Sequence, residues 1–286
     1  MIIRDEVINH VRRCKIHFDS QIEAANYLRG SSSNWYGSST ALSSHNWDFN
    51  VGNEGAERLA IQGWSEGAKD LSDRLVVHMP ERDHVASWRY DVAGEMPDIG
   101  RYLSGDPVHM RRHGHPKGHK PIISLFINNW IVCHTTAQQM ANYGAAMVSL
   151  IDQLENSGRR VEVVAGTVAE SMSSSRVMMS ATWKVKGAED HLDLGALAFA
   201  VAHPAASRRF GWRLWERTAA PTDRGYGSGM GRVTDEHDLI DPMPGTLIIN
   251  GIKMSGSSCD TLEGALMFAA GQINDAAGET LVTVEG

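Results

Sequence analysis

The sequence predicts an α/β protein, and its C-terminal half carries the prediction. Residues 121–127 form a nearly continuous apolar run of strand length, as in strands that are buried on both faces of a parallel sheet. Residues 137–155 then place apolar side chains on one helical face, and residues 159–165 are again rich in strand formers. This order of strand, helix and strand predicts a right-handed βαβ unit. The 286 residues, 42% of them hydrophobic, can bury a sizeable core.

The region before this βαβ unit is irregular and predicts more helix than strand. A helix is expected to start at Asp19-Ser20, with Ser20 or Asp19 as its cap and Glu23 in its first turn. Residues 55–75 have the apolar spacing of one or two amphipathic helices. A short strand at 88–92 and a short helix at 98–103 follow.

Three further segments complete the α/β part. Residues 177–185 alternate in polarity, and the short link before them predicts antiparallel pairing with the second strand. Residues 192–215 predict two helices, because His203-Pro204 interrupts the helical pattern. A fourth strand at 246–250 and a capped helix at 260–275 follow. We therefore expect an irregular, mostly helical N-terminal region, 1–118, and an α/β domain, 119–286.

This order of elements, with an antiparallel edge strand third, resembles the von Willebrand factor A domain, a Rossmann-like three-layer α/β/α sandwich. Such domains often bind a divalent cation through Asp-x-Ser-x-Ser after the first strand and an Asp after the fourth, since these ions prefer hard oxygen ligands. Here Asn128 stands in place of the first Asp, Trp130 and Val132 replace the two Ser, and Asn250 follows the fourth strand. The resemblance therefore implies a degenerate metal motif.

Three short motifs before this domain support a second resemblance. Residues 63–67 read GWSEG, residues 91–94 read DVAG and residues 105–110 read GDPVHM. Their combination looks like uncharacterised proteins of tailed phages and prophages. It implies a phage or prophage origin, with a location in the host cytoplasm, and no particular activity.

Cysteine use and the N-terminal residues also predict a cytoplasmic protein. Cys14, Cys133 and Cys259 are odd in number and far apart, which suits reduced thiols. An acidic pair at residues 5–6 occupies the place where a signal peptide needs an apolar core. Residues 121–151 carry no charge, but several amides interrupt them, so a membrane span is not expected.

The net charge of −7 argues against attraction of the whole molecule to nucleic acid, but residues 101–120 are locally basic. Within them, four imidazoles occur in eleven residues, at His109, His113, His115 and His119. Neutral imidazoles at this spacing can bind Zn, and the surrounding arginines and lysines can bind phosphate. An alternative function is therefore a metal- or phosphate-using nucleic-acid-binding protein that acts through the glycine-containing loop 109–120.

No motif assigns a catalytic residue, so the leading hypothesis is a non-catalytic protein–protein interaction or adaptor protein. In α/β proteins, ligands bind at the carboxyl ends of the strands. Eight tryptophans favour a binding role, because aromatic residues are enriched in interfaces. A second alternative is a small-molecule or nucleotide enzyme at the same sheet edge. The partner and the oligomeric state stay open. The residues expected to bind a protein partner are Asn128, Asn129, Trp130, Ser173, Ser174, Asn250 and Ser255.

Overall fold

The chain has two compact units in the computed structural model. The larger unit combines Met1–Val77 with Ile122–Gly286, and the smaller unit is His78–Pro121. The N-terminal region expected at 1–118 is thus divided between the two units. The structure describes residues 1–29, 48–69, 88–94, 96–113, 122–131, 135–170, 177–218, 232–233, 239–252 and 256–284.

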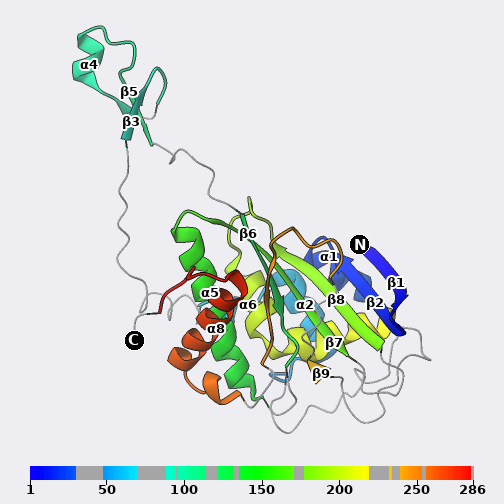
Figure 1. Cartoon of the computed structure of the whole chain (residues 1–286). Helices are drawn as coiled ribbons and strands as arrows, with labels where there is room; N and C mark the ends of the chain where they lie inside the picture. Colours follow the sequence, from blue (N-terminus) through cyan, green and yellow to red (C-terminus); the bar gives the residue numbers. More distant parts are fainter. Residues whose placement is uncertain are drawn as a thin grey trace. The chain divides into compact units, whose positions relative to one another are not determined.

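The larger unit is built on a seven-stranded mixed sheet in the order β1-β2-β8-β7-β6-β10, with β9 paired to the end of β7. Neighbours are parallel at β2–β8, β7–β6 and β6–β10, and antiparallel at β1–β2, β8–β7 and β7–β9. Together with the helices described below, this sheet confirms the α/β class (Figure 1). The strands are β1 Ile2–Ile8, β2 Val11–Phe18, β6 Ile122–Asn128, β7 Arg160–Glu170, β8 Val177–Lys186, β9 Arg232–Val233 and β10 Leu247–Ile249.

The four strands predicted in the C-terminal half are confirmed, with one correction to their arrangement. The apolar run at β6 pairs in parallel with β7 through the helix between them, and β8 returns antiparallel to β7. However, β8 is not an edge strand, because β2 pairs with its free side, from Arg12 opposite Val177 to Phe18 opposite Trp183. The sheet therefore continues into the N-terminal residues.

The N-terminal hairpin β1–β2 was not expected from the sequence. Its two-residue turn consists of Asn9 and His10, whose φ angles are 50° and 63°. Positive φ at both central residues is the geometry of a type I′ turn, which matches the twist of the flanking strands. Cys14, Ile16 and Phe18 alternate along β2 and point into the core, so a strand signal was present in this segment.

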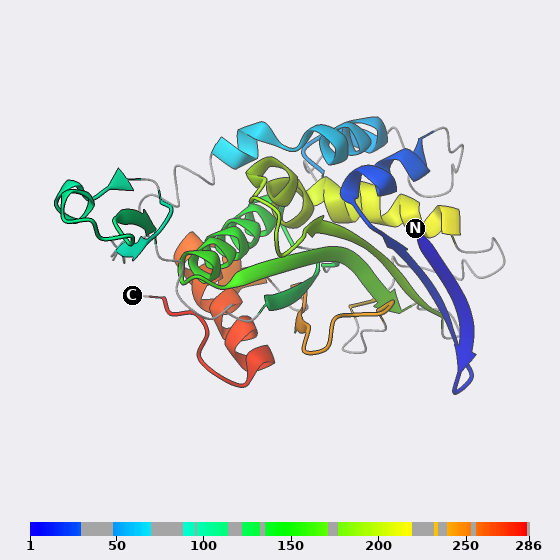
Figure 2. The same ribbon diagram turned by 90° about the horizontal axis from the view of Figure 1, so that it is seen from above.

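Helices cover one face of the sheet (Figure 2). The break expected at His203-Pro204 is confirmed, and Ser20, Thr136 and Thr261 cap their helices through side-chain oxygens. In the part of the chain that the structure describes, no helix is both long and apolar enough to cross a membrane. The helices whose bounds lie within the described residues are α1 Gln21–Leu28, α2 Gly52–Gln62, α5 Ala137–Asn156, α6 Leu194–Ala202, the π-helix η1 Ala206–Gly211, α7 Trp212–Thr218, the 3-10 turn η3 Gly256–Cys259 and α8 Leu262–Ala277.

The two faces of the sheet differ in chemistry. On the helical face, side chains such as Leu125, Val163 and Trp183 share one apolar core with the helices. The opposite face carries ion pairs and hydrogen bonds, such as Lys15 with Glu6, Lys184 with Glu162 and His17 with Thr182. Segment 239–246 contacts this opposite face, since Arg4 pairs with Asp241 and Thr246 donates to Ser124 (Figure 2).

In its described residues, the smaller unit has a three-stranded antiparallel sheet and one short helix. The strand order is β3-β5-β4, with β3 Trp88–Asp91, β4 Met96–Pro97 and β5 Met110–His113. Helix α4, Ile99–Leu103, follows β4 and confirms the predicted short helix. The first part of the histidine-containing segment, predicted as loop, is strand β5 instead, because it pairs with both β3 and β4.

Candidate functional site

Asn128 ends β6 at the predicted sheet edge, and its side-chain amide forms hydrogen bonds with backbone groups. The side chain is fully buried. Its Nδ2 donates to the carbonyl of Val168 at 3.1 Å, while its Oδ1 accepts from the backbone N–H groups of Val168 and Trp130 at 3.2 and 3.1 Å. The amide thus continues the sheet like an extra stretch of backbone and is not directed outward.

Asn129 and Trp130 are likewise turned into the protein. The Nδ2 of Asn129 donates to the carbonyl of Ala200 in α6 at 3.1 Å. The indole of Trp130 stacks on Trp215 with ring centroids 4.5 Å apart, and Trp212 lies beside it. Both side chains are at least nine-tenths buried. The prediction that Asn128, Asn129 and Trp130 contact a partner is therefore corrected: these side chains hold the edge together.

Of the remaining residues predicted at this edge, only Asn250 lies within the described residues, and it contacts the rest of the edge through its backbone. The carbonyl of Asn250 accepts from the hydroxyl of the buried Tyr143 at 3.1 Å. At Gly251, an added Cβ would lie 1.8 Å from the carbonyl oxygen of Trp130, so the two loops meet through backbone. Ser173, Ser174 and Ser255 lie outside the described residues. The structure thus brings the loops after β6 and β10 together, as predicted, but as a packed edge.

Arginines of η1 and α7 form buried ion pairs on the helical face of the sheet. Arg209 pairs with Asp48, Nε to Oδ2 at 2.5 Å, and both side chains are almost inaccessible. Arg213 pairs with Glu57 of α2. Burial against Phe49 and Trp64 lowers the pKa of His203 to about 4, so this imidazole is neutral. These groups attach α2 to η1 and α7, and little of their charge is exposed.

The histidines predicted to bind Zn or phosphate are only partly within the described residues. The Nδ1 of His109 lies 2.8 Å from the carbonyl oxygen of Asp106, and its ring meets Tyr102 edge to face. His113 ends β5, and His115 and His119 lie outside the described residues. Among the residues that are described, no three His, Cys, Asp or Glu side chains gather as metal ligands would.

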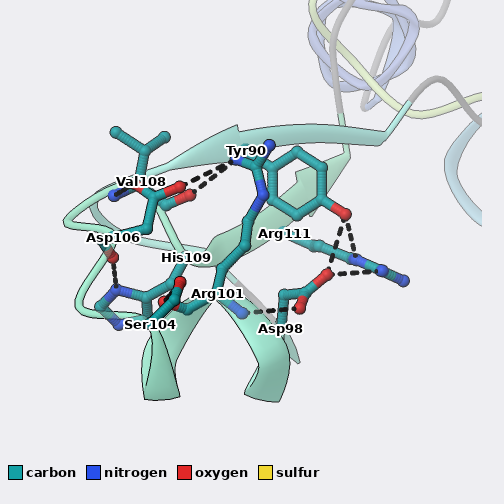
Figure 3. A network of polar contacts seen from close by, with 8 residues as sticks. All are labelled: Tyr90, Asp98, Arg101, Ser104, Asp106, Val108, His109 and Arg111. Atoms are coloured by element: carbon teal, nitrogen blue, oxygen red, sulfur yellow. Dashed lines mark hydrogen bonds and ion pairs between the residues drawn. The ribbon is translucent and has the colours of Figure 1, made fainter.

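A polar network centred on Asp98 holds the smaller unit together (Figure 3). The carboxylate of Asp98 caps α4 by accepting from the backbone N–H of Arg101 at 3.2 Å. It also accepts from the hydroxyl of Tyr90 at 2.9 Å and from Arg111 at 2.7 Å. These three donors lower the pKa of Asp98 from 3.8 to about 2. Asp98 thereby joins β3, α4 and β5.

Arg101 adds a second layer to this network. Its guanidinium lies over the ring of Tyr90, 3.8 Å from the centroid, and donates to the carbonyl of Val108 at 3.2 Å. Its other contact is the carboxylate of Asp106 at 3.4 Å. Arg101 and Arg111, two of the basic residues of the segment 101–120, are therefore both engaged within the unit.

The apolar side chains of α4 remain mostly exposed, although Tyr102 packs on His109. Ile99, Tyr102 and Leu103 are 61%, 60% and 78% exposed, and α4 buries no residue at all. Their spacing of three and four residues places them on one helical face. Met96 in β4 is a further exposed apolar side chain, at 51%. We call these four residues the α4 face. The sequence predicted the helix but gave no sign that the described residues leave this face exposed.

Asp98→Asn should abolish the response of the smaller unit to acid. A carboxylate whose pKa is lowered on folding stabilises the fold above pH 4, and this stabilisation is lost as the pH falls from about 4 to about 2. In NMR spectra of the full chain, the Arg101 amide of the wild type should shift through this window. The Asn variant should show no such transition, whereas Glu189→Gln, an exposed change in the larger unit, should keep it. A wild-type transition near pH 4 would contradict the network.

The comparisons with known proteins give a family and no activity. No curated protein and no solved structure matches the chain. The family model described as "Domain of unknown function (DUF7192)" matches residues 4–281, which include both compact units. Because this match covers nearly all of the sequence, the chain belongs to the DUF7192 family.

Proposed function

We propose that this chain is a non-catalytic protein–protein interaction protein whose smaller unit presents the binding surface. The observation that carries the proposal is the α4 face, formed by Met96, Ile99, Tyr102 and Leu103, all of them more than half exposed. Exposed apolar residues that gather on one element are typical of interaction sites, whereas scattered ones are not. The interaction expected at the sheet edge is thus assigned to a different place on the chain.

The way the smaller unit folds supports this assignment. Its elements are joined by Asp98, Tyr90, Arg101 and Arg111 through hydrogen bonds, ion pairs and a cation–π contact. Apolar residues of a small unit normally have to build its core. Because the polar network joins these elements, the apolar side chains of α4 are available for a partner.

The spacing of the α4 face indicates what kind of surface it fits. Side chains at positions i, i+3 and i+4 of a helix are the usual anchors when a helix lies in an apolar groove. Residues 101–120, which include the end of α4, carry five basic residues against one aspartate. The partner is therefore a protein with an apolar groove and an acidic rim, since such a rim complements this charge.

The larger unit acts as a von Willebrand A-like scaffold in this proposal. Its strands β8, β7, β6 and β10 lie in the order third, second, first and fourth of the predicted domain, with β8 antiparallel to β7. The β1–β2 hairpin and the polar second face depart from the expected sandwich. At the position of the metal motif, Asn128 bonds to backbone, which fits a scaffold that supports binding elsewhere.

A charge placed on the α4 face should remove partner binding. Leu103→Asp is expected to weaken the affinity for a partner captured with the wild-type chain by about 30-fold or more, which corresponds to ~2 kcal/mol for a binding hot spot. The matched control is Met267→Asp, because Met267 is also a highly exposed apolar residue on a helix, α8 of the larger unit. Titration calorimetry with the purified partner gives both affinities. Equal affinities for the two variants would contradict the proposal.

A further inference from the structure

Strand β1 is a long edge strand of the large sheet, with exposed apolar residues on both sides of a charged centre, Arg4-Asp5-Glu6. Among the described strands it pairs with β2 alone. Ile2, Ile3, Val7 and Ile8 are 40%, 50%, 69% and 40% exposed. Edge strands are usually short, charged or bulged, since an open row of backbone N–H and C=O groups invites pairing with another strand. Seven residues without a proline or a bulge leave this edge ready to pair.

The backbone groups that face outward can be identified from the hairpin. In its type I′ turn, the flanking residues Ile8 and Val11 form the first hydrogen-bonded pair. Because such pairs alternate along an antiparallel ladder, the even-numbered residues of β1 direct their N–H and C=O groups toward β2. Ile3, Asp5 and Val7 therefore direct theirs away from the sheet.

The sequence of β1 is complementary to itself when read in the opposite direction. With a two-fold axis at Asp5, Ile2 lies opposite Ile8 of a second copy, Ile3 lies opposite Val7, and Arg4 lies opposite Glu6. The pairs Ile3–Val7 and Asp5–Asp5 then become the hydrogen-bonded ones, and these are the residues whose backbone groups point outward. Both the charges and the hydrogen-bonding pattern thus suit the same register.

Contacts within the chain prepare the charged centre of β1 for this pairing. The two Asp5 carboxylates would meet at the axis, but each is bound by Arg12 of its own chain at 2.5 Å, which lowers the pKa of Asp5 and offsets the repulsion. On the polar face of the sheet, Arg4 forms an ion pair with Asp241, and Glu6 forms an ion pair with Lys15. These contacts fix the orientation of both side chains beside the edge.

We propose that two copies of this chain dimerise by antiparallel pairing of their β1 strands, centred on Asp5. The same strand contributes on both sides, so the contact is closed by a two-fold axis and gives a dimer and not a fibre. The two seven-stranded sheets become continuous through the pair. This surface differs from the α4 face, so the dimer does not depend on the function proposed for the smaller unit.

Sedimentation equilibrium on the full-length chain tests the dimer. The wild type should sediment as a dimer, and Val7→Lys should raise the dimer dissociation constant at least about tenfold, since it places a charge opposite Ile3 of the other copy. Val7 is the most exposed apolar residue of β1, at 69%, so the variant should keep its fold. The matched control, Met267→Lys on α8, should stay dimeric. A monomeric wild type, or a dimer that Val7→Lys leaves unchanged, would overturn the proposal.

Disulfide trapping tests the register. Ile2 and Ile8 of the other copy form a non-hydrogen-bonded pair, whose Cα atoms lie about 4.5 Å apart, within reach of a disulfide. Ile2→Cys and Ile8→Cys should each fail to cross-link alone, because like positions lie at opposite ends of the strand pair. Mixed and oxidised, the two variants should give a covalent dimer that contains one chain of each kind. Cross-linking of either variant alone, or none in the mixture, would exclude this register.

Discussion

Replacing Asp48 with Ala is expected to lower the free energy of unfolding of the larger unit by about 3–5 kcal/mol. The carboxylate of Asp48 is fully buried and lies 2.5 Å from Arg209, which is itself only 6% exposed. Removing the carboxylate leaves the guanidinium in a site that water does not reach. A buried charge that loses a counter-ion costs far more than the lost contact. Urea unfolding, followed by tryptophan fluorescence, measures the effect.

Two further variants separate this effect from a general sensitivity to charge. Asp48→Asn keeps the shape of the side chain and a hydrogen-bond acceptor, so its loss should be smaller than that of the Ala variant. Glu189→Ala removes a carboxylate that is 74% exposed and pairs with Arg160, and it should cost less than about 1 kcal/mol. Similar losses of unfolding free energy for Asp48→Ala and Glu189→Ala would mean that the Asp48–Arg209 ion pair is not structurally important.

A single methyl group at Gly144 is expected to destabilise the larger unit by about 1–3 kcal/mol. Gly144 lies in α5 where this helix crosses α6, and an added Cβ would come within 2.2 Å of the Cα atom of Ala202. The obstacle is backbone, which a rotamer change cannot relieve, so the two helices must move apart. Thermal unfolding of Gly144→Ala by calorimetry should show a lowered Tm.

The same substitution at Gly271 should have the opposite sign. Gly271 lies within α8, and an added Cβ there meets nothing within 4 Å. Since alanine favours the helix over glycine by about 0.5–1 kcal/mol, Gly271→Ala should raise the Tm. A lowered Tm in both variants would show that loss of helix–helix packing at Gly144 is not the cause.

The elements that could be predicted are those whose local sequence pattern is enough to identify them as helix, strand or break. The apolar run of β6, the capped helix α5 and the break at Pro204 each require little knowledge of distant residues. By contrast, β1 exposes both of its faces and therefore lacks the alternation that marks a half-buried strand. Its turn, Asn9-His10, also lacks the glycine that usually signals a two-residue hairpin. These reasons explain why β1 was missed. In β2, which extends the sheet beyond β8, the alternation of Cys14, Ile16 and Phe18 was a strand signal that went unused.

The candidate site depended on contacts that sequence spacing does not reveal. Asn128 and Trp130 were placed correctly at the sheet edge, but their burial follows from Val168 and from Trp215, which lie far along the chain. For α4, the helix was predicted, whereas the exposure of Tyr102 and Leu103 follows from the absence of any covering element among the described residues. Whether an apolar helical face is core or surface is decided by its neighbours.

Amide hydrogen exchange tests the proposed interaction surface most directly. The full-length chain is compared free and bound to a partner captured with the wild-type protein, at equal total concentration so that β1 pairing is the same in both samples. Our account predicts added protection confined to residues 96–103, which hold the α4 face. Unchanged exchange at 96–103, with protection at the loops after β6 and β10, would contradict it and return the interaction to the sheet edge.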